Sequence, residues 1–307
     1  MTYLCVDGGQ TKTAVVLMDE GGREVEAWRA GPLTTPSKPG AMDNLRAVVR
    51  DIADELGRRT REGLQGFPEA ACFSLTGYME GDDAISSVIR EEMEKAVSGV
   101  GRIHVVPDYV GNWAAATGGK PGVMVISGGG SVAYGRTGSG EALRIGGWGH
   151  VLGDEGSGFW IGLEAIKAAL KSRAGVIPET ALGECVMCEF GTQDERRVIR
   201  EVYSAFFSEA EIANLVPLVA SLAQEGDAAA TRILEEAAGH LSHIVRALLR
   251  RLGDLAVYPS GGVFRAPTML DRFEKALEAS GNEVEIKDTV NADPIDGVFL
   301  IARRGIR

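Results

Sequence analysis

The sequence is short of cysteine, of positive charge and of long apolar runs. Only four of its 307 residues are cysteine, too few for a disulfide scaffold in a chain of this length. The 32 basic residues are outnumbered by 43 acidic ones, which argues against general binding of nucleic acid. No apolar run approaches the roughly 20 residues of a membrane span, and Met1 to Leu4 lead directly into a predicted strand rather than a signal peptide. We therefore expect a cytoplasmic protein without nucleic-acid or membrane partners.

The four cysteines include one Cys-x-x-Cys pair, Cys185 and Cys188. Such a pair can be a redox couple or half of a metal site. A zinc or cluster site needs further soft ligands nearby, whereas Cys5 and Cys72 fall in predicted core strands. We interpret the pair as two partly buried thiols on a helix, because free cysteine is often buried.

Adjacent glycines occur twice in the same context, 120 positions apart. Gly8 and Gly9 follow the apolar residues Leu4 to Val6, and Gly128 and Gly129 follow Val125 and Ile126. After each pair the chain resumes with small and apolar residues, turns at a second glycine cluster and enters a third strand. This repetition predicts a duplicated domain with a glycine-rich loop in each half. Glycine lets backbone N–H groups approach an anion, so two such loops facing one another are typical of a two-domain phosphotransferase.

Strands and helices alternate along the chain, which predicts the α/β class. A chain of 307 residues suggests about two domains. We expect one domain over residues 1–115 and another over 116–293, with a hinge near 109–121. The last helix, within 294–307, is expected to pack back on the first domain. Further strands are predicted at 14–18, 24–28, 70–75, 103–106, 255–258 and 283–287. Helices are predicted at 43–59, 159–171, 194–207, 209–224, 227–252 and 294–302, with others starting after Asp82–Asp83, near Val110 and at Pro267.

Two aspartates stand where predicted strands end. Asp7 precedes the first glycine pair, where its carboxylate could hold Mg²⁺ through water; the alternative is an ordinary Asp-Gly turn. Lys12 could reach a phosphate or be solvated. Asp108 is the candidate general base for phosphoryl transfer to a hydroxyl group, and its alternative role is the N-cap of the next helix. Asn112, one helical turn on, could orient Asp108 or face solvent.

A tryptophan in a glycine-rich loop marks the second half. Residues 146–158 set six glycines and Ser157 around Trp148, His150, Asp154 and Glu155. Sugars present flat apolar faces and rims of hydroxyl groups, so an aromatic side chain beside carboxylates suits their recognition. His150 and Glu155 could instead close a structural network between the loop and the next helix.

Taken together, these motifs resemble N-acetylglucosamine kinases and the BadF/BadG/BcrA/BcrD-type ATPases. The resemblance spans nearly the whole chain and is most specific in residues 146–158. It implies a duplicated ribonuclease-H-like, actin-like ATPase fold around a central cleft, with ATP and Mg²⁺ as cofactors. The matching segments are 7–13, Asp108, 127–131, 146–158 and the adenosine-loop match 260–264.

The resemblance also implies roles for individual residues in a kinase that phosphorylates an amino sugar. Asp108 becomes the catalytic base and Asp7 the metal-binding residue. ATP and its phosphates would be bound by Gly8, Gly9, Gln10, Thr11, Lys12, Gly128, Gly129, Gly130, Ser131, Gly261 and Gly262. The sugar would be contacted by Gly147, Trp148, Gly149 and Asp154, with His150 and Glu155 also assigned to the substrate.

Two departures from the family pattern leave the sugar open. Gly129 stands where the family usually has threonine, and no asparagine follows Gly31-Pro32 until Asn44. N-acetylglucosamine, glucosamine and other hexose derivatives are therefore all candidates. The rival functions are a coupling ATPase and a non-catalytic sugar sensor. The sequence does not determine the oligomeric state, and a homodimer is compatible with it.

Overall fold

The chain forms two compact units. The computed structural model describes residues 1–9, 12–33, 40–64, 66–79, 81–97, 99–204, 209–279, 284–287 and 292–305. The first unit comprises Met1–Lys120 with Ala292–Arg307, and the second comprises Pro121–Asn291.

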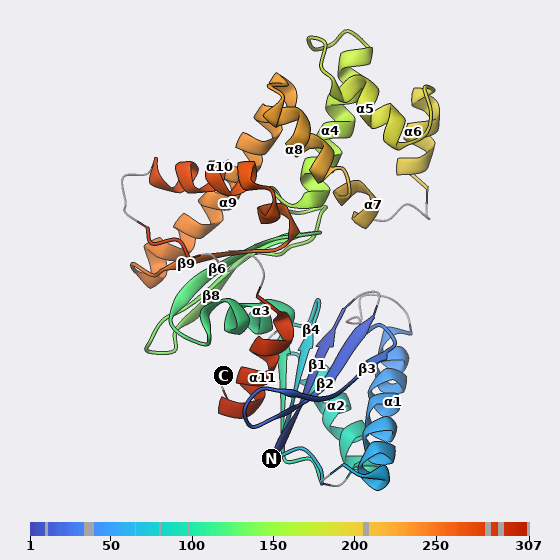
Figure 1. The fold of residues 1–307 in the computed structure, drawn as a ribbon, viewed down its shortest axis with the longest axis vertical. Helices are drawn as coiled ribbons and strands as arrows, with labels where there is room; N and C mark the ends of the chain where they lie inside the picture. The colour runs from blue at the N-terminus through green and yellow to red at the C-terminus, as the bar shows by residue number, and fades with distance from the viewer. Residues whose placement is uncertain are drawn as a thin grey trace. The chain divides into compact units, whose positions relative to one another are not determined.

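The first unit is built on a five-stranded sheet with the order β3-β2-β1-β4-β5 (Figure 1). The pairs β1/β2 and β2/β3 are antiparallel, whereas β1/β4 and β4/β5 are parallel. The strands are β1 (Thr2–Gly8), β2 (Thr13–Asp19), β3 (Glu24–Ala30), β4 (Ala70–Leu75) and β5 (Arg102–Pro107). The helices are α1 (Ala41–Glu62), α2 (Asp83–Ala96), α3 (Asp108–Thr117) and α11 (Pro294–Arg304).

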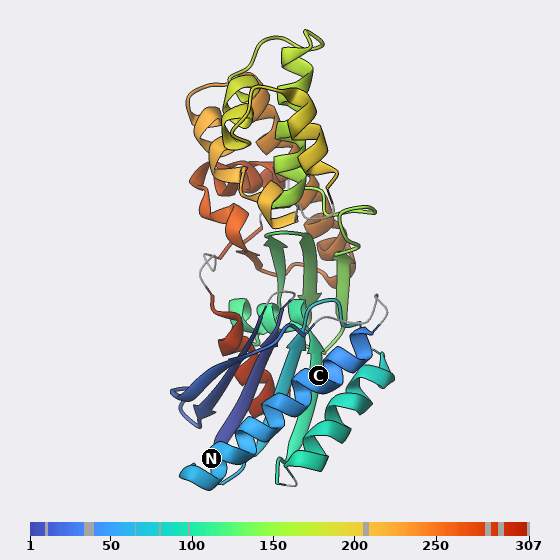
Figure 2. The same ribbon diagram turned by 90° about the vertical axis from the view of Figure 1, so that its right-hand side faces the viewer.

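Helices cover both faces of this sheet. Figures 1 and 2 show α1 and α2 on one face and α3 and α11 on the other. Side chains alternate along a strand, so Leu4 and Val6 join the fully buried core beneath α1 and α2. Cys5 and Asp7, on the same strand, point to the opposite face, where α3 and α11 pack. Each buried aliphatic side chain of this kind stabilises the fold by about 1.5–3 kcal/mol.

The C-terminal helix is held in the first unit by close backbone packing. α11 packs against α3 and β1. A Cβ added to Gly297 would lie 1.9 Å from the carbonyl oxygen of Gly111 and 2.4 Å from the backbone nitrogen of Ala115, so only glycine fits there. Phe299 places its ring edge-on to Tyr3, with 5.6 Å between ring centroids. These contacts explain how a segment distant in sequence completes the first unit.

The second unit repeats the sheet pattern with more helix. Its sheet has the order β8-β7-β6-β9, with β6/β7 and β7/β8 antiparallel and β6/β9 parallel. Ile286 forms an isolated parallel bridge with Val257, which adds to the β9 side of the sheet. The strands are β6 (Gly122–Ser127), β7 (Ser131–Arg136), β8 (Ala142–Gly146) and β9 (Val257–Ser260). The helices are α4 (Gly158–Arg173), α5 (Leu182–Glu189), α6 (Glu195–Val202), α7 (Glu209–Ala213), α8 (Val216–Gln224), α9 (Ala228–Leu252), the 3₁₀ turn η1 (Gly262–Arg265) and α10 (Pro267–Glu278).

The predicted duplication of an α/β unit is therefore confirmed. The predicted helix starts after Asp82 and at Asp227 are also confirmed, because both side chains cap their helices. Asp227 accepts hydrogen bonds from the backbone N–H groups of Ala229 and Ala230 at 3.0 and 2.9 Å. A side-chain acceptor at this position satisfies N–H groups that have no partner within the helix.

Several predicted boundaries were wrong. The single helix predicted over 209–224 is two helices, α7 and α8, because Pro217 lies in the first turn of α8. Proline lacks an N–H, and its ring clashes with the carbonyl four residues earlier, here Ala213. The helix predicted over 194–207 ends at Val202, and residues 205–208 lie outside the described residues. The strand predicted at 255–258 runs from Val257 to Ser260, in register with β6.

The predicted strand 283–287 is only partly described. Glu283 lies outside the described residues, and Ile286 forms a single bridge rather than a strand. Among the described residues, none of the helices combines the length and the apolar character that crossing a bilayer requires.

Candidate active site

The first glycine loop follows β1 directly. A Cβ on Gly8 would lie 2.7 Å from Leu75 Cδ2 and 2.9 Å from Leu33 Cβ, so packing alone requires glycine at this position. The backbone N–H of Gly9 donates to the carbonyl of Lys12 at 3.1 Å, which brings the two ends of the loop together. Lys12 is exposed. Gln10 and Thr11 lie outside the described residues, so their phosphate contacts stay predictions.

Asp108 stands at the junction of β5 and α3. Pro107 is the N-cap residue, and Asp108 is the first residue of the helix. Its Oδ1 accepts a hydrogen bond from the backbone N–H of Tyr109 at 2.8 Å. Asp108 therefore lies in the first turn of α3, at the positive end of the helix dipole. Asn112 donates from Nδ2 to the backbone carbonyl of Asp108 at 2.8 Å, so it contacts the main chain of Asp108 rather than its carboxylate.

Asp7 lies in the field of two other carboxylates of the first unit. Burial, followed by the nearby charges of Asp108 and Asp293, raises the pKa of Asp7 from 3.8 to about 6. Asp293 is the N-cap of α11, and its Oδ1 accepts the backbone N–H of Ile295 at 3.0 Å. Two further carboxylates at element ends of this unit, Asp108 and Asp293, therefore act electrostatically on Asp7.

Asp293 was missed by the sequence analysis, although two signals pointed to it. An aspartate directly before Pro294 is typical of a helix N-cap, and the last helix was expected to pack on the first domain. These signals predict where that helix begins and which domain it joins, but not which strands its start lies near. Because Asp293 acts on Asp7 from near the opposite end of the chain, local sequence patterns alone do not reveal the interaction.

The second glycine loop joins β6 to β7. A Cβ on Gly130 would lie 2.8 Å from Asp154 Oδ2, so packing explains this glycine. A Cβ on Gly128 or Gly129 would meet nothing within 4 Å, and neither residue has a left-handed backbone. Neither packing nor backbone strain therefore explains these two glycines. Close approach of a ligand to the backbone would explain them.

The tryptophan-containing segment, residues 146–158, is bonded to this second loop. Asp154 Oδ1 accepts the backbone N–H of Ser131 at 3.1 Å, and Ser131 Oγ donates to the carbonyl of Glu155 at 2.9 Å. Ser127 Oγ donates to the carbonyl of Gly156 at 2.7 Å. The segments assigned to phosphate and to sugar thus form one hydrogen-bonded structure.

Asp154 has an unusual backbone conformation. It is the one residue other than glycine with a positive φ in the described part of the chain, at 63°. Aspartate tolerates the left-handed region better than most residues, yet the conformation still carries strain. Burial raises the pKa of Asp154; the Ser131 hydrogen bond acts in the opposite direction, and the charge of Glu209 raises the pKa further. A strained and partly desolvated carboxylate of this kind is typical of a functional site.

Trp148 is exposed, with 59% of its surface accessible. Its ring lies against Gly153 of the same segment, where an added Cβ would come within 3.3 Å of Trp148 Cε3. Gly149 has a positive φ and open space where a Cβ would be. Gly147 also has a positive φ, and there an added Cβ would press on Val132. The indole is therefore available to a ligand.

His150 connects this segment to two helices. Its Nδ1 lies 2.9 Å from Glu209 Oε1 at the start of α7. Its ring lies 5.0 Å from the ring of Phe159 on α4, centroid to centroid. The alternative to sugar binding was that His150 closes a structural network between the loop and the next helix, and such a network requires contacts of this kind. Glu209 was not considered in the sequence analysis, because a glutamate starting a helix gives no local signal of such a contact.

The predicted adenosine loop follows β9. Gly261 has a φ of 100°, and a Cβ there would lie 2.3 Å from the carbonyl oxygen of Ser127. Gly262 has open space where a Cβ would be. The loop is therefore adjacent to the second glycine loop, since Ser260 pairs in register with Ile126.

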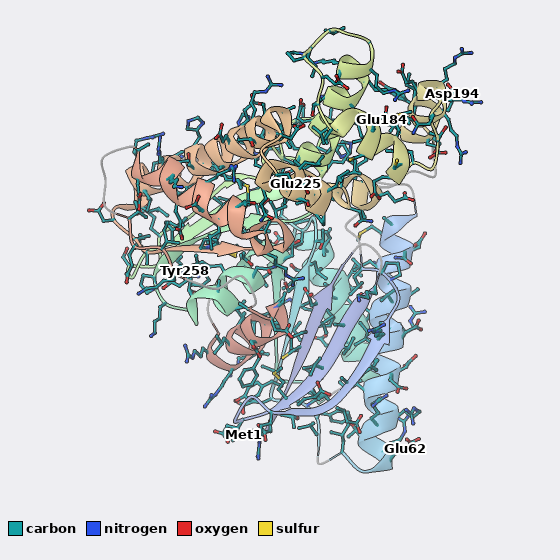
Figure 3. The ribbon with its side chains drawn as sticks, turned by 45° about the horizontal axis from the view of Figure 1, so that its top comes forward. Met1, Glu62, Glu184, Asp194, Glu225 and Tyr258 are labelled. Atoms are coloured by element: carbon teal, nitrogen blue, oxygen red, sulfur yellow. The ribbon has the colours of Figure 1, made fainter. Side chains whose placement is uncertain are left out.

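The cysteine pair lies apart from these loops. Cys185 and Cys188 are on α5; Cys185 is partly buried, and burial raises its pKa, whereas Cys188 is exposed. Glu184 and Asp194 mark this part of the second unit in Figure 3. Among the described residues, no group of three or more His, Cys, Asp or Glu side chains is arranged to hold a metal ion.

Two cavities have linings that include none of the predicted site residues, although the second reaches Val106 and Val110 on either side of Asp108. One of about 300 Å³ is lined in part by Glu189, Phe190 and Glu211. The other, of about 560 Å³, is lined by residues of α2 and β5, including Arg90 and His104. Because neither cavity includes a predicted site residue, the candidate site is defined by the strand-end loops and their carboxylates.

The matches to known proteins extend over nearly the whole chain. Residues 4–300 match the model of the BadF/BadG/BcrA/BcrD ATPase family. The chain is 32% identical to the N-acetylmuramic acid/N-acetylglucosamine kinase of Clostridium acetobutylicum, over 97% of both chains. It is 27% identical to the N-acetyl-D-glucosamine kinase of Dictyostelium discoideum, over 98% of this chain and 97% of the relative.

A solved structure shares the fold. The protein of Porphyromonas gingivalis provisionally designated an N-acetylglucosamine kinase matches with a TM-score of 0.74 at 22% identity, over 99% of both chains. At this identity the likeness concerns the fold, which is the predicted actin-like, ribonuclease-H-like duplication.

Proposed function

Because the chain belongs to the BadF/BadG/BcrA/BcrD ATPase family, we propose that it is an ATP-dependent kinase acting on a hydroxyl group of an amino sugar. The observation that carries this proposal is Asp108 in the first turn of α3, in the same unit as the strand-end carboxylate Asp7 that it acts on electrostatically. The two kinases similar over nearly the full chain support it.

In the proposed reaction Asp108 is the general base. The sugar hydroxyl oxygen attacks the γ-phosphorus of ATP, and the bond from that phosphorus to the oxygen bridging the β- and γ-phosphates breaks, so ADP leaves. The hydroxyl proton passes to the carboxylate of Asp108. The hydrogen bond from Tyr109 N–H to Oδ1 orients this carboxylate.

The phosphates of ATP are assigned to the glycine loops. Backbone N–H groups from Gly8, Gly9 and the segment Gly128–Ser131 suit an anion, and Lys12 would add positive charge. Gly128, Gly129 and Gly262 have open space where side chains would otherwise lie. Gln10 and Thr11 keep their predicted phosphate contacts as part of the proposal, and Gly261 shapes the adenosine loop.

The first unit suits Mg²⁺ held through water. The pKa of Asp7 is raised partly by Asp108 and Asp293, and a cation would offset this repulsion. Mg²⁺ usually keeps several waters and is held by one or two carboxylates together with substrate phosphates, a role that Asp7 would fill in part. When bound, Mg²⁺ would neutralise charge on those phosphates.

The acceptor is assigned to residues 147–155. Trp148 supplies an exposed aromatic face, and Asp154 would accept hydrogen bonds from sugar hydroxyl groups. His150 and Glu155 would shape the site from the same segment. Both curated relatives carry N-acetylglucosamine in their names, so we propose an N-acetylated hexosamine as the substrate class. Asn44, the first asparagine after Gly31-Pro32, donates its side-chain amide to the Pro32 carbonyl at 3.0 Å.

The proposal is tested by measuring ADP release and phosphosugar formation with the purified chain, ATP and Mg²⁺. N-acetylglucosamine, N-acetylmuramic acid, glucosamine and glucose are compared. We expect sugar-dependent turnover that favours the N-acetylated sugars. ATP hydrolysis that is indifferent to every sugar would instead support the coupling ATPase, and binding without turnover would support the sugar sensor. Cytoplasmic location and a homodimer remain predictions.

A further inference from the structure

Ser74 is a buried polar residue without an evident role in the fold. It lies on β4, is 1% exposed, and its Oγ has no hydrogen-bond partner among the described residues. An unsatisfied buried hydroxyl costs free energy, and alanine would avoid this cost. The hydroxyl group does not fill a gap in the packing. Instead, the neighbouring Gly111 must lack a Cβ so that the Ser74 hydroxyl has room. An added Cβ there would lie 2.6 Å from Ser74 Oγ.

The neighbour of Ser74 across the sheet is Asp7. The two residues are direct partners in the parallel register of β1 and β4. Direct partners in adjacent strands point to the same face, and neighbouring strands lie about 4.8 Å apart. Hydroxyl and carboxylate are therefore within reach through side-chain rotation. The other neighbour of Ser74, Val106 on β5, has an apolar side chain that offers no acceptor.

We propose that Ser74 is a positioning residue for Asp7, donating a hydrogen bond to its carboxylate when Asp7 acts on the hydrated cation of the nucleotide. The inference rests on the proposed function, in which Asp7 has that role. A donor within the sheet holds the carboxylate in one orientation while leaving its other oxygen for water. Burial beneath Gly111 on α3 limits the orientations of Ser74.

Cys72 provides a matched control. It lies two residues earlier on β4, faces the same side of the sheet and is fully buried. Cys72→Ala removes one heavy atom from the same environment, as Ser74→Ala does, but it removes no donor near Asp7. A structural effect of truncation should therefore appear in both variants, and an effect through Asp7 only in Ser74→Ala.

The test measures ADP affinity by calorimetry with Mg²⁺ and with a chelator, together with thermal unfolding. We expect Ser74→Ala to weaken ADP binding about five- to tenfold in Mg²⁺, the scale of one hydrogen bond, and to have no effect in the chelator. Its unfolding midpoint should equal or exceed that of the wild type. Cys72→Ala should bind ADP normally under both conditions. In the Asp7→Asn background, Ser74→Ala should have no further effect on binding.

Three outcomes would overturn the inference. The first is that Ser74→Ala binds ADP in Mg²⁺ as tightly as the wild type. The second is that Ser74→Ala loses as much ADP affinity in the chelator as in Mg²⁺. The third is that Ser74→Ala lowers the unfolding midpoint and still weakens ADP binding in the Asp7→Asn background. A wild-type chain that binds no ADP in Mg²⁺ would instead count against the proposed function itself, so the two failures are distinguishable.

Discussion

The carboxylate of Asp154 accepts the backbone N–H of Ser131 at 3.1 Å, and this bond joins the segment assigned to the sugar to the loop assigned to phosphate. Asp154 holds this contact from a left-handed backbone conformation. On residue types alone, loss of Asp154 would be expected to affect the sugar more than ATP. The hydrogen bond changes that expectation, because one side chain supports both loops.

We predict that Asp154→Ala raises the KM of both ATP and the sugar, each by about tenfold, since a buried backbone donor left unpaired costs about 1–3 kcal/mol. Steady-state kinetics with each substrate varied in turn measures the effect. Asp154→Asn is the matched control, because its amide oxygen still accepts from Ser131 and asparagine tolerates a positive φ. A raised sugar KM with an unchanged ATP KM would show that the bond to Ser131 does not support the phosphate loop.

We predict that Asp108→Asn lowers kcat by about 10²-fold or more and leaves ADP affinity within about twofold, because an amide cannot take the hydroxyl proton. Rapid-quench or coupled assays measure turnover, and calorimetry measures ADP binding. Asp83→Asn, the same change in the first turn of α2, should leave turnover unaffected. Near-normal kcat in Asp108→Asn would remove this residue from the mechanism.

The pKa of Asp7 predicts an unusual dependence of stability on pH. Its pKa is about 6 in the folded chain against 3.8 ordinarily, so the folded state binds the proton more tightly. The ionised carboxylate therefore destabilises the fold increasingly as pH rises from about 4 to about 6. Asp7→Asn should be more stable than wild type above pH 6, on the order of 1–3 kcal/mol, and the gain should vanish near pH 4.

Denaturant unfolding of both proteins across pH 4–8 measures this difference. Asp19→Asn is the control of opposite sign. The backbone hydrogen bond from Arg23 lowers the pKa of Asp19 in the folded chain. The ionised Asp19 carboxylate therefore stabilises the fold above the ordinary pKa of 3.8, and this stabilisation is lost as pH falls through the lower pKa of the folded state. This variant should be less stable than wild type near neutral pH. A pH-independent difference for Asp7→Asn would contradict the assignment of its pKa.

Packing between α11 and α3 predicts a further effect on stability. Gly297→Ala would bring its Cβ against the backbone of Gly111 and Ala115, which cannot yield as a flexible side chain does. We expect a loss of about 1–3 kcal/mol or more in the free energy of unfolding. Gly239→Ala in α9, where an added Cβ meets nothing within 4 Å, should instead stabilise the chain by about 0.5–1 kcal/mol. Equal effects of the two variants would show that α11 does not pack so closely.

The sequence by itself determined the features that depend on neighbouring residues. Apolar runs that end at glycine or proline predicted strands in both sheets, helical spacing of apolar residues predicted α1, and Asp82 and Asp83 predicted the start of α2. The two glycine pairs predicted the duplication, since each lies at the end of a strand whose pattern is visible locally. The break between α7 and α8 is also local, because it depends on Pro217, yet a single helix was predicted across it.

Only the tertiary structure decided which distant residues act together. It brought Asp293 into the electrostatic field of Asp7, bonded Asp154 to Ser131, and placed Glu209 against His150. It also separated glycines required by packing, such as Gly8 and Gly130, from those with open space, such as Gly128 and Gly129. Periodicity and capping report interactions within a few residues along the chain. Contacts across a sheet or between helices depend on register and close packing, which no single segment specifies.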